Sequence, residues 1–406
     1  MVGCGEVLSP AQQRRAQIAA ETGDIPIALV WPQNFNTSYL RGAALAIAEI
    51  NAEIDAGTRT LRGDRKLRAQ VFDSDPGGRS QAEVGYQIAS RIVSHSAGFV
   101  AVFGHGYSDI AIPASVLYDE AGILLISPGA YKVNLTRHGF LHVFRTAPTT
   151  EVLSTNTALA MSVTSQRVAV LYATRSGARE ELALAFEDAA VELGLEIPYF
   201  KSYSPTQRDL RPLFADIATQ RVDGIFIAGN GSTRRLAVQQ GRDLGLTIPF
   251  YYPDPIDVVD YYGRLGDRMR DVYAPVLFNP QSQRPEVQAF IRNYRARYDG
   301  ENPDNWAAQG YDVVQLYAHV VEMSGSVAPL TLANTMRFTL SWRGVTGRHS
   351  FTRSGDVYTK ILDFAAVDVD KDTDDDSERL LILSPEPEEA ITFSELAPVA
   401  TEVAGP

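Results

Sequence analysis

The chain has 406 residues, of which 45% are hydrophobic and 21% charged, and its 37 Lys and Arg against 49 Asp and Glu give a formal net charge of −12. This length predicts two or three folded units, because single domains average about 150 residues. The acidic balance argues against a nucleic-acid-binding protein, and no apolar run reaches the ~18 residues that a membrane-spanning helix needs. With Cys4 as its single cysteine, the chain can form neither an intramolecular disulfide nor a cysteine-based zinc site.

The first part of the chain predicts one doubly wound α/β unit. A capped helix over Ala11–Thr22 leads into strands and helices that alternate, and the strands are apolar on both faces. Such strands are typical of a parallel sheet covered by helices on both sides. The expected strands are Ile25–Trp31, Lys66–Asp73, Gly98–Phe103 and Ile123–Ile126, and the expected helices are Tyr39–Glu53, Ser80–Val93 and Ile110–Tyr118.

A second series of the same kind begins near Phe144–Thr150. Its expected helices are Glu151–Val163, Glu180–Leu193, Leu210–Gln220 and Ser232–Leu244, and its expected strands are Arg167–Tyr172, Tyr199–Tyr203, Gly224–Ala228, Pro249–Tyr252 and Val272–Val276. The pattern then loosens into helices at Pro285–Tyr298, Trp306–Met323 and Leu330–Phe338, followed by strands at Tyr358–Ala366 and Glu378–Ser384. The sequence thus predicts two α/β units in tandem.

No known catalytic or cofactor motif accompanies these elements. The first strand ends in Trp31-Pro32-Gln33-Asn34, without the glycines that a dinucleotide or P-loop phosphate site requires. The six histidines are scattered without metal-binding spacing. The acidic run from Asp368 to Asp376 lacks the Gly and Glu spacing of a calcium loop, so we interpret it as a solvated hairpin tip. We therefore expect no enzyme activity, no cofactor and no metal site.

Ligands bind outside the carboxyl ends of the strands in doubly wound sheets. Those ends supply Trp31–Phe35, Gly104–Ser108 and Ser127–Tyr131 in the first unit, and Tyr172–Gly177, Gly229–Ser232 and Tyr251–Asp254 in the second. Small residues and a serine at a helix start expose backbone N–H groups that suit a carboxylate, and Asp254 could hold a cation. Taken singly, each of these reads as an ordinary loop residue, and their joint placement on two units favours a ligand site.

Three short motifs are specific enough to indicate a family: Gly104-His105 with Ser108, Pro113-Ala114-Ser115, and Gly122-Ile123-Leu124 leading to Ser127-Pro128. Supporting matches are Gly42-Ala43, Ile50-Asn51, Asp73–Pro76, Arg145-Thr146, Asp223-Gly224, Gly347–Phe351 and Gly355-Asp356. Together they resemble the type I periplasmic binding proteins, and in particular the leucine/isoleucine/valine-binding family that serves ABC importers. The resemblance covers roughly Ile25 to Ala366.

This resemblance implies two doubly wound parallel-sheet lobes, joined by a three-segment hinge, with the ligand trapped in the cleft between them. The hinge crossings would fall near Phe144–Pro148, Ala274–Asn279 and Ser350–Phe351. The implied organisation is an N-terminal lead at 1–24, a first lobe at 25–145 and 279–350, a second lobe at 146–278 and 351–385, and a tail at 386–406.

The resemblance also implies roles for individual residues. The Ser108 hydroxyl and the amides of Gly129 and Ala130 would hold the α-carboxylate of a ligand, and Asp254 would hold its α-ammonium. Phe35 and Trp306 match aromatic positions that line the side-chain pocket.

Some positions depart from the family pattern. Tyr131 stands where the family has a threonine and Asn230 where it has a tyrosine, while Ser74 and Tyr107 replace the cysteines of an early disulfide. The resulting wall is unusually aromatic and also permits an aromatic or quaternary-amine ligand. Its expected members are Trp31, Phe35, Tyr107, Tyr131 and Trp306.

We therefore expect a periplasmic or otherwise extracytoplasmic solute-binding protein, with an ABC permease as its partner and no affinity for nucleic acid. Its ligand would be an amino acid or a related amine, carboxylate or aromatic metabolite, held by hinge closure. The alternative is a ligand sensor of the same fold that regulates a signalling partner. Met1-Val2-Gly3-Cys4-Gly5 resembles the end of a bacterial lipoprotein signal, so Cys4 is the predicted lipid anchor and the expected attachment to a membrane.

Overall fold

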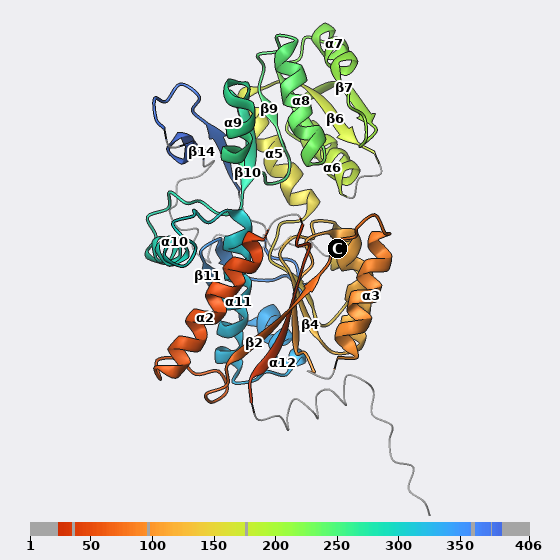
Figure 1. Cartoon of the computed structure of the whole chain (residues 1–406). Coiled ribbons are helices and arrows are strands. Elements are labelled where there is room, and N and C mark those ends of the chain that lie inside the picture. The colour runs from red at the N-terminus through yellow and green to blue at the C-terminus, as the bar shows by residue number, and fades with distance from the viewer. Residues whose placement is uncertain are drawn as a thin grey trace, which may run out of the picture.

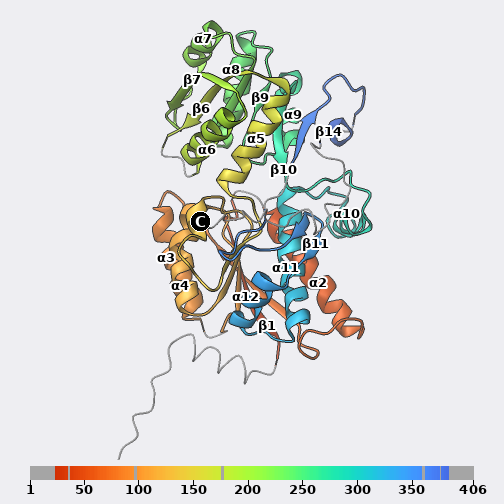
Figure 2. The same cartoon turned by 180° about the vertical axis from the view of Figure 1, so that it is seen from behind.

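The computed structural model describes residues 23–34, 37–95, 98–174, 178–358, 362–374 and 376–383. They form two α/β lobes that lie end to end, as Figures 1 and 2 show from opposite sides. The fold class predicted from the sequence is therefore confirmed, since parallel strands dominate the main sheet of each lobe.

The first lobe is a parallel sheet between two layers of helices. Within the described residues its strand order is β2-β1-β3-β4-β5. The strands are β1 (Ile25–Trp31), β2 (Leu67–Asp73), β3 (Ala101–Gly104), β4 (Leu124–Ser127) and β5 (Val143–Arg145). The helices are α2 (Ser38–Asp55), α3 (Gln81–Val93), α4 (Ser108–Glu120) and the short η1 (Val133–Leu135), joined from later in the chain by α10 (Pro285–Arg297), α11 (Asn305–Ser324), α12 (Pro329–Phe338) and the hairpin β11 (Trp342–Gly344) with β12 (Gly347–His349).

Alternate side chains of β1 enter two separate hydrophobic cores, because successive residues of a strand point to opposite faces of the sheet. Ile27 and Leu29 pack with α2 and α11, whereas Ala28 and Val30 pack with α3 and α4. This two-sided burial explains the continuous apolar run of the strand. Because β1 pairs parallel with β3, and β3 with β4, the carboxyl ends of the three strands lie side by side at one edge of the sheet.

The second lobe follows the same plan with a mixed sheet. Its described strand order is β14-β13-β10-β9-β8-β6-β7. The strands are β6 (Arg167–Ala173), β7 (Glu196–Tyr203), β8 (Gly224–Ala228), β9 (Phe250–Tyr251), β10 (Val272–Val276), β13 (Asp363–Val367) and β14 (Leu380–Leu383). The helices are α5 (Thr150–Thr164), α6 (Arg179–Glu192), α7 (Arg211–Thr219), α8 (Gly231–Asp243), α9 (Val258–Leu265), η2 (Gly266–Met269) and η3 (Asp376–Arg379).

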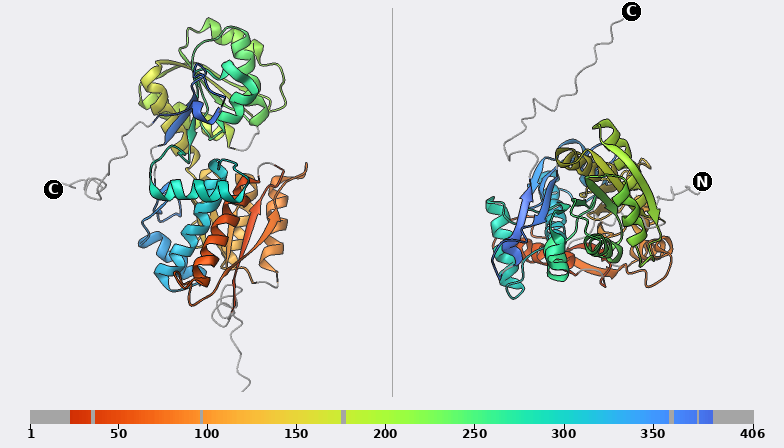
Figure 3. Two further views of the ribbon diagram at one scale, coloured as in Figure 1. Left: turned by 60° about the vertical axis from the view of Figure 1, so that its left-hand side comes forward. Right: turned by 90° about the horizontal axis from the view of Figure 1, so that it is seen from above.

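The last two strands complete the second sheet from the far end of the chain. β13 pairs antiparallel with β10, and β14 pairs antiparallel with β13. Figure 3 shows these blue strands beside the green ones of the same lobe. The segment between them begins with the acidic run, where Asp370 pairs with Arg270 of the second lobe at 2.5 Å and both side chains are at least half exposed.

The described chain passes between the lobes in three places. It does so between β5 and α5, between β10 and α10, and between Val357 and β13. The third crossing comes later than the predicted Ser350–Phe351, because Phe351 and Val357 are buried in the first-lobe core. Gly355 lies against β5 with φ +99°, and a Cβ there would sit 2.1 Å from the Val143 oxygen. Residues 351–357 therefore belong with the first lobe rather than the second.

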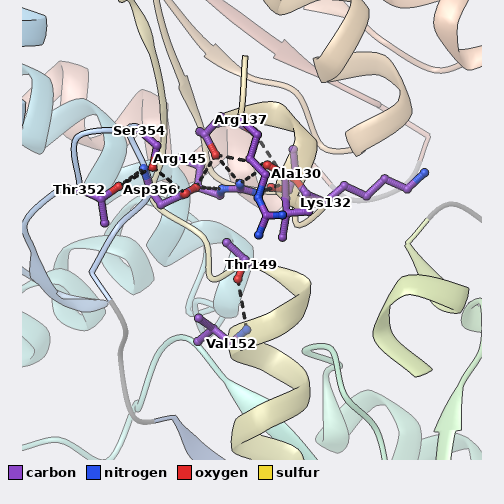
Figure 4. Close-up of polar contacts among 12 residues, drawn as sticks. Ala130, Lys132, Arg137, Arg145, Thr149, Val152, Thr352, Ser354 and Asp356 are labelled. Carbon is purple, nitrogen blue, oxygen red and sulfur yellow. Dashed lines mark hydrogen bonds and ion pairs between the residues drawn. The ribbon is translucent and has the colours of Figure 1, made fainter. Parts of the chain in front are cut away.

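A fully buried arginine ties two of these crossings to the edge of the first sheet. Arg145, at the end of β5, donates from Nε to Asp356 Oδ1 at 2.6 Å and from Nη2 to Thr136 Oγ1 at 2.7 Å. Its Nη1 donates to the carbonyl oxygens of Ala130 at 3.1 Å and Lys132 at 2.7 Å (Figure 4). Burial lowers the pKa of the Arg145 guanidinium, and the Asp356 carboxylate offsets part of that shift. One cation thus holds the loop over residues 130–136 against the segment that precedes the third crossing.

The long helices of the first lobe touch backbone to backbone. A Cβ on Gly42 of α2 would lie 1.9 Å from the Ala307 oxygen, and one on Gly310 of α11 would lie 2.0 Å from the Tyr39 oxygen. This close approach brings Trp306, in the first turn of α11, beside Trp31, with ring centroids 5.1 Å apart. Helix packing in the core therefore sets one wall of the region between the lobes.

Replacing Arg145 with methionine is expected to lower the free energy of unfolding by roughly 3–5 kcal/mol, because Asp356 and several carbonyl oxygens would be left buried without a donor. Urea denaturation followed by circular dichroism measures the change. Arg137→Met is the control, since the Arg137–Glu151 pair is 58% and 55% exposed and its loss should cost less than about 1 kcal/mol. Similar losses in the two variants would contradict the structural role of Arg145.

Gly42→Ala is expected to destabilise the protein by about 1–3 kcal/mol, because the added methyl group must push α2 and α11 apart. Alanine is the better helix former by about 1 kcal/mol, so a stabilised variant would show that the helices tolerate the shift. The same denaturation experiment reports the outcome. Ala52→Ser, on the exposed side of α2, is the control and should change stability by about 0.5 kcal/mol or less.

Candidate ligand-binding site between the lobes

The first-lobe side of the interface is built on the indole of Trp31. This side chain is fully buried, stacks on Tyr39 with centroids 4.0 Å apart, and lies beside Trp306. A Cβ on Gly106 or on Gly129 would lie 3.3 Å from the indole ring, so both loops rest directly on it. Three of the residues predicted to form the site, Trp31, Trp306 and Gly129, thus lie together in the structure.

Two of the groups predicted to hold a carboxylate already have hydrogen-bond partners within the first lobe. The Ser108 hydroxyl, at the start of α4, accepts the Lys132 amide at 3.1 Å. The Ala130 amide donates to Ser127 Oγ at 3.3 Å. Ser108 keeps its hydroxyl proton as a donor, because accepting a hydrogen bond does not use it. These loops are therefore held in place before any ligand binds, with fewer free donors than the sequence predicted.

The second-lobe side is a cluster of charges around Asp254. This residue follows β9, and its carboxylate lies 2.9 Å from Arg179 Nη1 and 3.0 Å from Arg234 Nη1. The side chains of Asp254, Arg234 and Arg179 are 5%, 10% and 19% exposed. Burial lowers the pKa of the Arg234 guanidinium, but the Asp254 carboxylate and the neighbouring tyrosines together raise it by more, so the net shift is upward. Both arginines remain charged, and Asp254 is their shared counter-ion.

Sequence reasoning missed these two arginines although the signal was present. Arg179 opens α6 and Arg234 lies in the first turn of α8, and these helices follow β6 and β8. The rule that ligands bind at the carboxyl ends of parallel strands therefore covers them as well. A ligand ammonium group at Asp254 would therefore compete with the two arginines that already pair with this carboxylate.

Tyr131 links the two sides. It lies in the first-lobe loop but packs in the second-lobe core with Leu153 and Tyr251. Burial raises the pKa of Tyr131 well above its usual value; the nearby Asp254 carboxylate adds to the rise, and the arginines oppose it. Among the described residues no group hydrogen-bonds its hydroxyl. Tyr131 thus presents a buried neutral phenol to the charged cluster.

Further contacts join the lobes near this point. Glu181 of α6 accepts the Val133 amide of the first lobe at 3.1 Å and also accepts the Thr150 hydroxyl. Burial raises the pKa of Tyr107, the Asp75 carboxylate adds to the rise, and the Arg179 guanidinium opposes it. Trp306 packs against core clusters of both lobes.

The remaining predicted site residues have other places. Asn230 caps α8: it accepts the Thr233 amide at 3.0 Å, and Thr233 Oγ1 accepts the Asn230 amide at 3.1 Å. Its side-chain Nδ2 also donates to the Pro205 carbonyl oxygen at 3.4 Å. Phe35 and Cys4 lie outside the described residues.

A cavity of about 330 Å³ lies beside the second crossing rather than at the charged cluster. It is lined by the start of α9, by residues 276–281 and by the segment 302–305 that leads into α11. Burial raises the pKa of Asp257 on its wall, and Asp304 contributes to the same shift. None of the predicted ligand residues that the structure describes lines this cavity, so it is distinct from the site described above.

The described residues offer neither a metal centre nor a membrane span. No group of three or more His, Cys, Asp and Glu side chains in this part of the chain could hold a metal ion. No helix within the same residues is long and apolar enough to cross a membrane.

Comparison with known proteins identifies the family. Residues 31–374 match the family model of the periplasmic binding proteins. The chain is 26% identical over 327 residues to the leucine-specific-binding protein of Salmonella typhimurium, covering 78% of this chain and 84% of that protein. It is 24% identical over 366 residues to the leucine-, isoleucine-, valine-, threonine- and alanine-binding protein of Pseudomonas aeruginosa, covering 87% and 92%.

A solved structure agrees with these relatives. The ABC transporter substrate-binding protein of Desulfitobacterium hafniense in complex with Leu is 30% identical, with a TM-score of 0.73, and the match covers 89% of this chain and all of that one. The chain therefore belongs to the type I periplasmic binding proteins of the branched-chain amino acid group, which bind solutes and are not enzymes.

Proposed function

We propose that the protein is the extracytoplasmic solute-binding component of an ABC importer and traps a small carboxylate-bearing solute, such as an amino acid or a related metabolite, between its lobes. The observation that supports this most directly is the position of Tyr131. A side chain from the first lobe reaches the charged groups of the second, beside Trp306, so one small molecule at this point would touch both lobes.

Each wall has a distinct part in this proposal. The Ser108 hydroxyl and the loop around Gly129 and Ala130 bind a polar end of the solute. Trp306, supported from behind by the buried Trp31, packs against its body. Asp254 orients the arginines and keeps lone pairs that can accept a hydrogen bond from a ligand. Asn230 supports the site indirectly, because it fixes the start of the helix that carries Arg234.

Capture proceeds by hinge closure about the three crossings. Each crossing has an anchor on the first lobe. Arg145 ends the strand before the first crossing and binds Asp356, which lies just before the third. In the second crossing, Asn305 Oδ1 accepts the backbone amides of Leu277 and Phe278 at 2.9 and 3.0 Å. The lobes can then move as rigid bodies. An ABC permease binds the closed conformation. A lipid on Cys4 keeps the protein at the membrane.

A thermal-shift screen against amino acids, dicarboxylates and aromatic acids is expected to find a stabilising solute. A compound at 100 times its Kd adds about 2.7 kcal/mol to stability, which is a clear rise in melting temperature. Small-angle scattering should show a smaller radius of gyration with the same compound. A broad panel without any stabilising compound would contradict the proposal.

Tyr131→Phe is expected to weaken binding of that solute about tenfold, because the hydroxyl is a buried donor at the point where the lobes meet. Calorimetry gives the affinity. Tyr251→Phe is the matched control: its hydroxyl lies 2.8 Å from Thr164 within the second lobe, so its removal should leave affinity unchanged. An unchanged affinity in Tyr131→Phe would remove this residue from the site.

A further inference from the structure

The charged cluster of the second lobe is not electrically balanced. Among the described residues, two guanidinium groups, Arg179 and Arg234, pair with the single carboxylate of Asp254, which leaves one excess positive charge in this part of the chain. Tyr131, Tyr203 and Tyr252 also face the cluster. Burial raises the pKa of each of these tyrosines, so they stay neutral and add no negative charge. An excess charge in so buried a place is costly unless an anion compensates it.

The same cluster holds hydrogen-bond donors that the described protein does not use. Arg234 is almost fully buried, and its Nε and Nη1 have no hydrogen-bond acceptor among the described residues. Arg234 Nη1 lies 3.0 Å from Asp254 Oδ1 and forms an ion pair with it, but the angles of this contact are not those of a hydrogen bond. The Tyr131 hydroxyl is a third unused donor beside them. Donors of this kind suit a carboxylate, which can take two parallel N–H bonds from a guanidinium.

We propose that the solute carries a carboxylate on the end that faces the second lobe, held by Arg179, Arg234 and the Tyr131 hydroxyl. The inference rests on the proposed function and narrows it to acidic solutes, namely dicarboxylates and acidic amino acids. A neutral branched-chain amino acid would instead bring its ammonium group to a cluster that is already positive, which Coulomb repulsion disfavours.

Calorimetry on the full chain with glutarate, L-glutamate and L-leucine tests this inference. Glutarate or L-glutamate is expected to bind at least tenfold more tightly than L-leucine, because a charge-assisted pair is gained in one case and a like charge is added in the other. Glutarate lacks the ammonium group, so the two acidic probes show whether Asp254 also accepts one. Tight binding of L-leucine with weak binding of both acids would overturn the inference and leave the proposed function intact, whereas no binding of any screened solute would contradict both.

Variants of Arg179 provide the second test, since this side chain is the more exposed of the two. Arg179→Gln should weaken binding of the acidic probe tenfold or more and should not weaken binding of L-leucine, since it removes a positive charge that repels the leucine ammonium. Arg179→Lys should recover part of the loss, because lysine keeps the charge but not the two parallel N–H donors of a guanidinium. Arg264→Gln is the control, because Arg264 pairs with Asp260 on the exposed side of α9 in the same lobe. Melting temperatures check that each variant folds. An unchanged affinity for the acidic probe in Arg179→Gln would overturn the inference.

Discussion

The Arg145 guanidinium lies inside the first lobe, out of contact with water, and the geometry of the ligand region depends on how it is accommodated. A buried cation is tolerated when oxygen atoms surround it on several sides. Here those oxygens come from the loop over 130–136 and from Asp356, far apart in the chain. Both segments must therefore adopt their observed positions together. The loop that presents Tyr131 and the segment that returns to the second lobe are fixed by one set of hydrogen bonds.

Hydrophobic packing sets the opposite wall by a different means. Gly42 and Gly310 let α2 and α11 approach until their backbones touch, and this contact places Trp306 beside Trp31. A rigid aromatic surface and a rigid polar loop thus meet at the ends of the same strands. Rigid walls suit hinge-based capture, because closure then brings preformed surfaces onto a ligand with little further ordering.

The chemistry of the second lobe depends on its side chains rather than on the shared architecture. The relatives named above bind leucine and other neutral amino acids according to their names, and the two-lobe framework of this chain is the same. The charges at the site are set by side chains that the framework does not dictate. Asp254 with two arginines forms a cluster of net positive charge on this common fold.

Much of the fold could be predicted from the sequence, because strand and helix periodicity are local properties. β1 was predicted at Ile25–Trp31 and is found there, since an apolar run between polar turns has few alternatives to a buried strand. Predicted boundaries failed where a tertiary contact decides them. β13 begins at Asp363 rather than Tyr358, because the first-lobe core holds Val357 and Arg145 holds Asp356.

The candidate site likewise has a part that follows from the sequence and a part that does not. The two α/β units and the positions of their strand ends could be predicted, because both follow from the order of the elements. Only the tertiary structure decided the electrostatics. Arg179, Arg234 and Asp254 come from three elements between 20 and 75 residues apart, and only their positions in space show that one carboxylate serves two guanidinium groups. Local sequence patterns do not encode such pairings, since the interaction depends on distance and burial rather than on spacing along the chain.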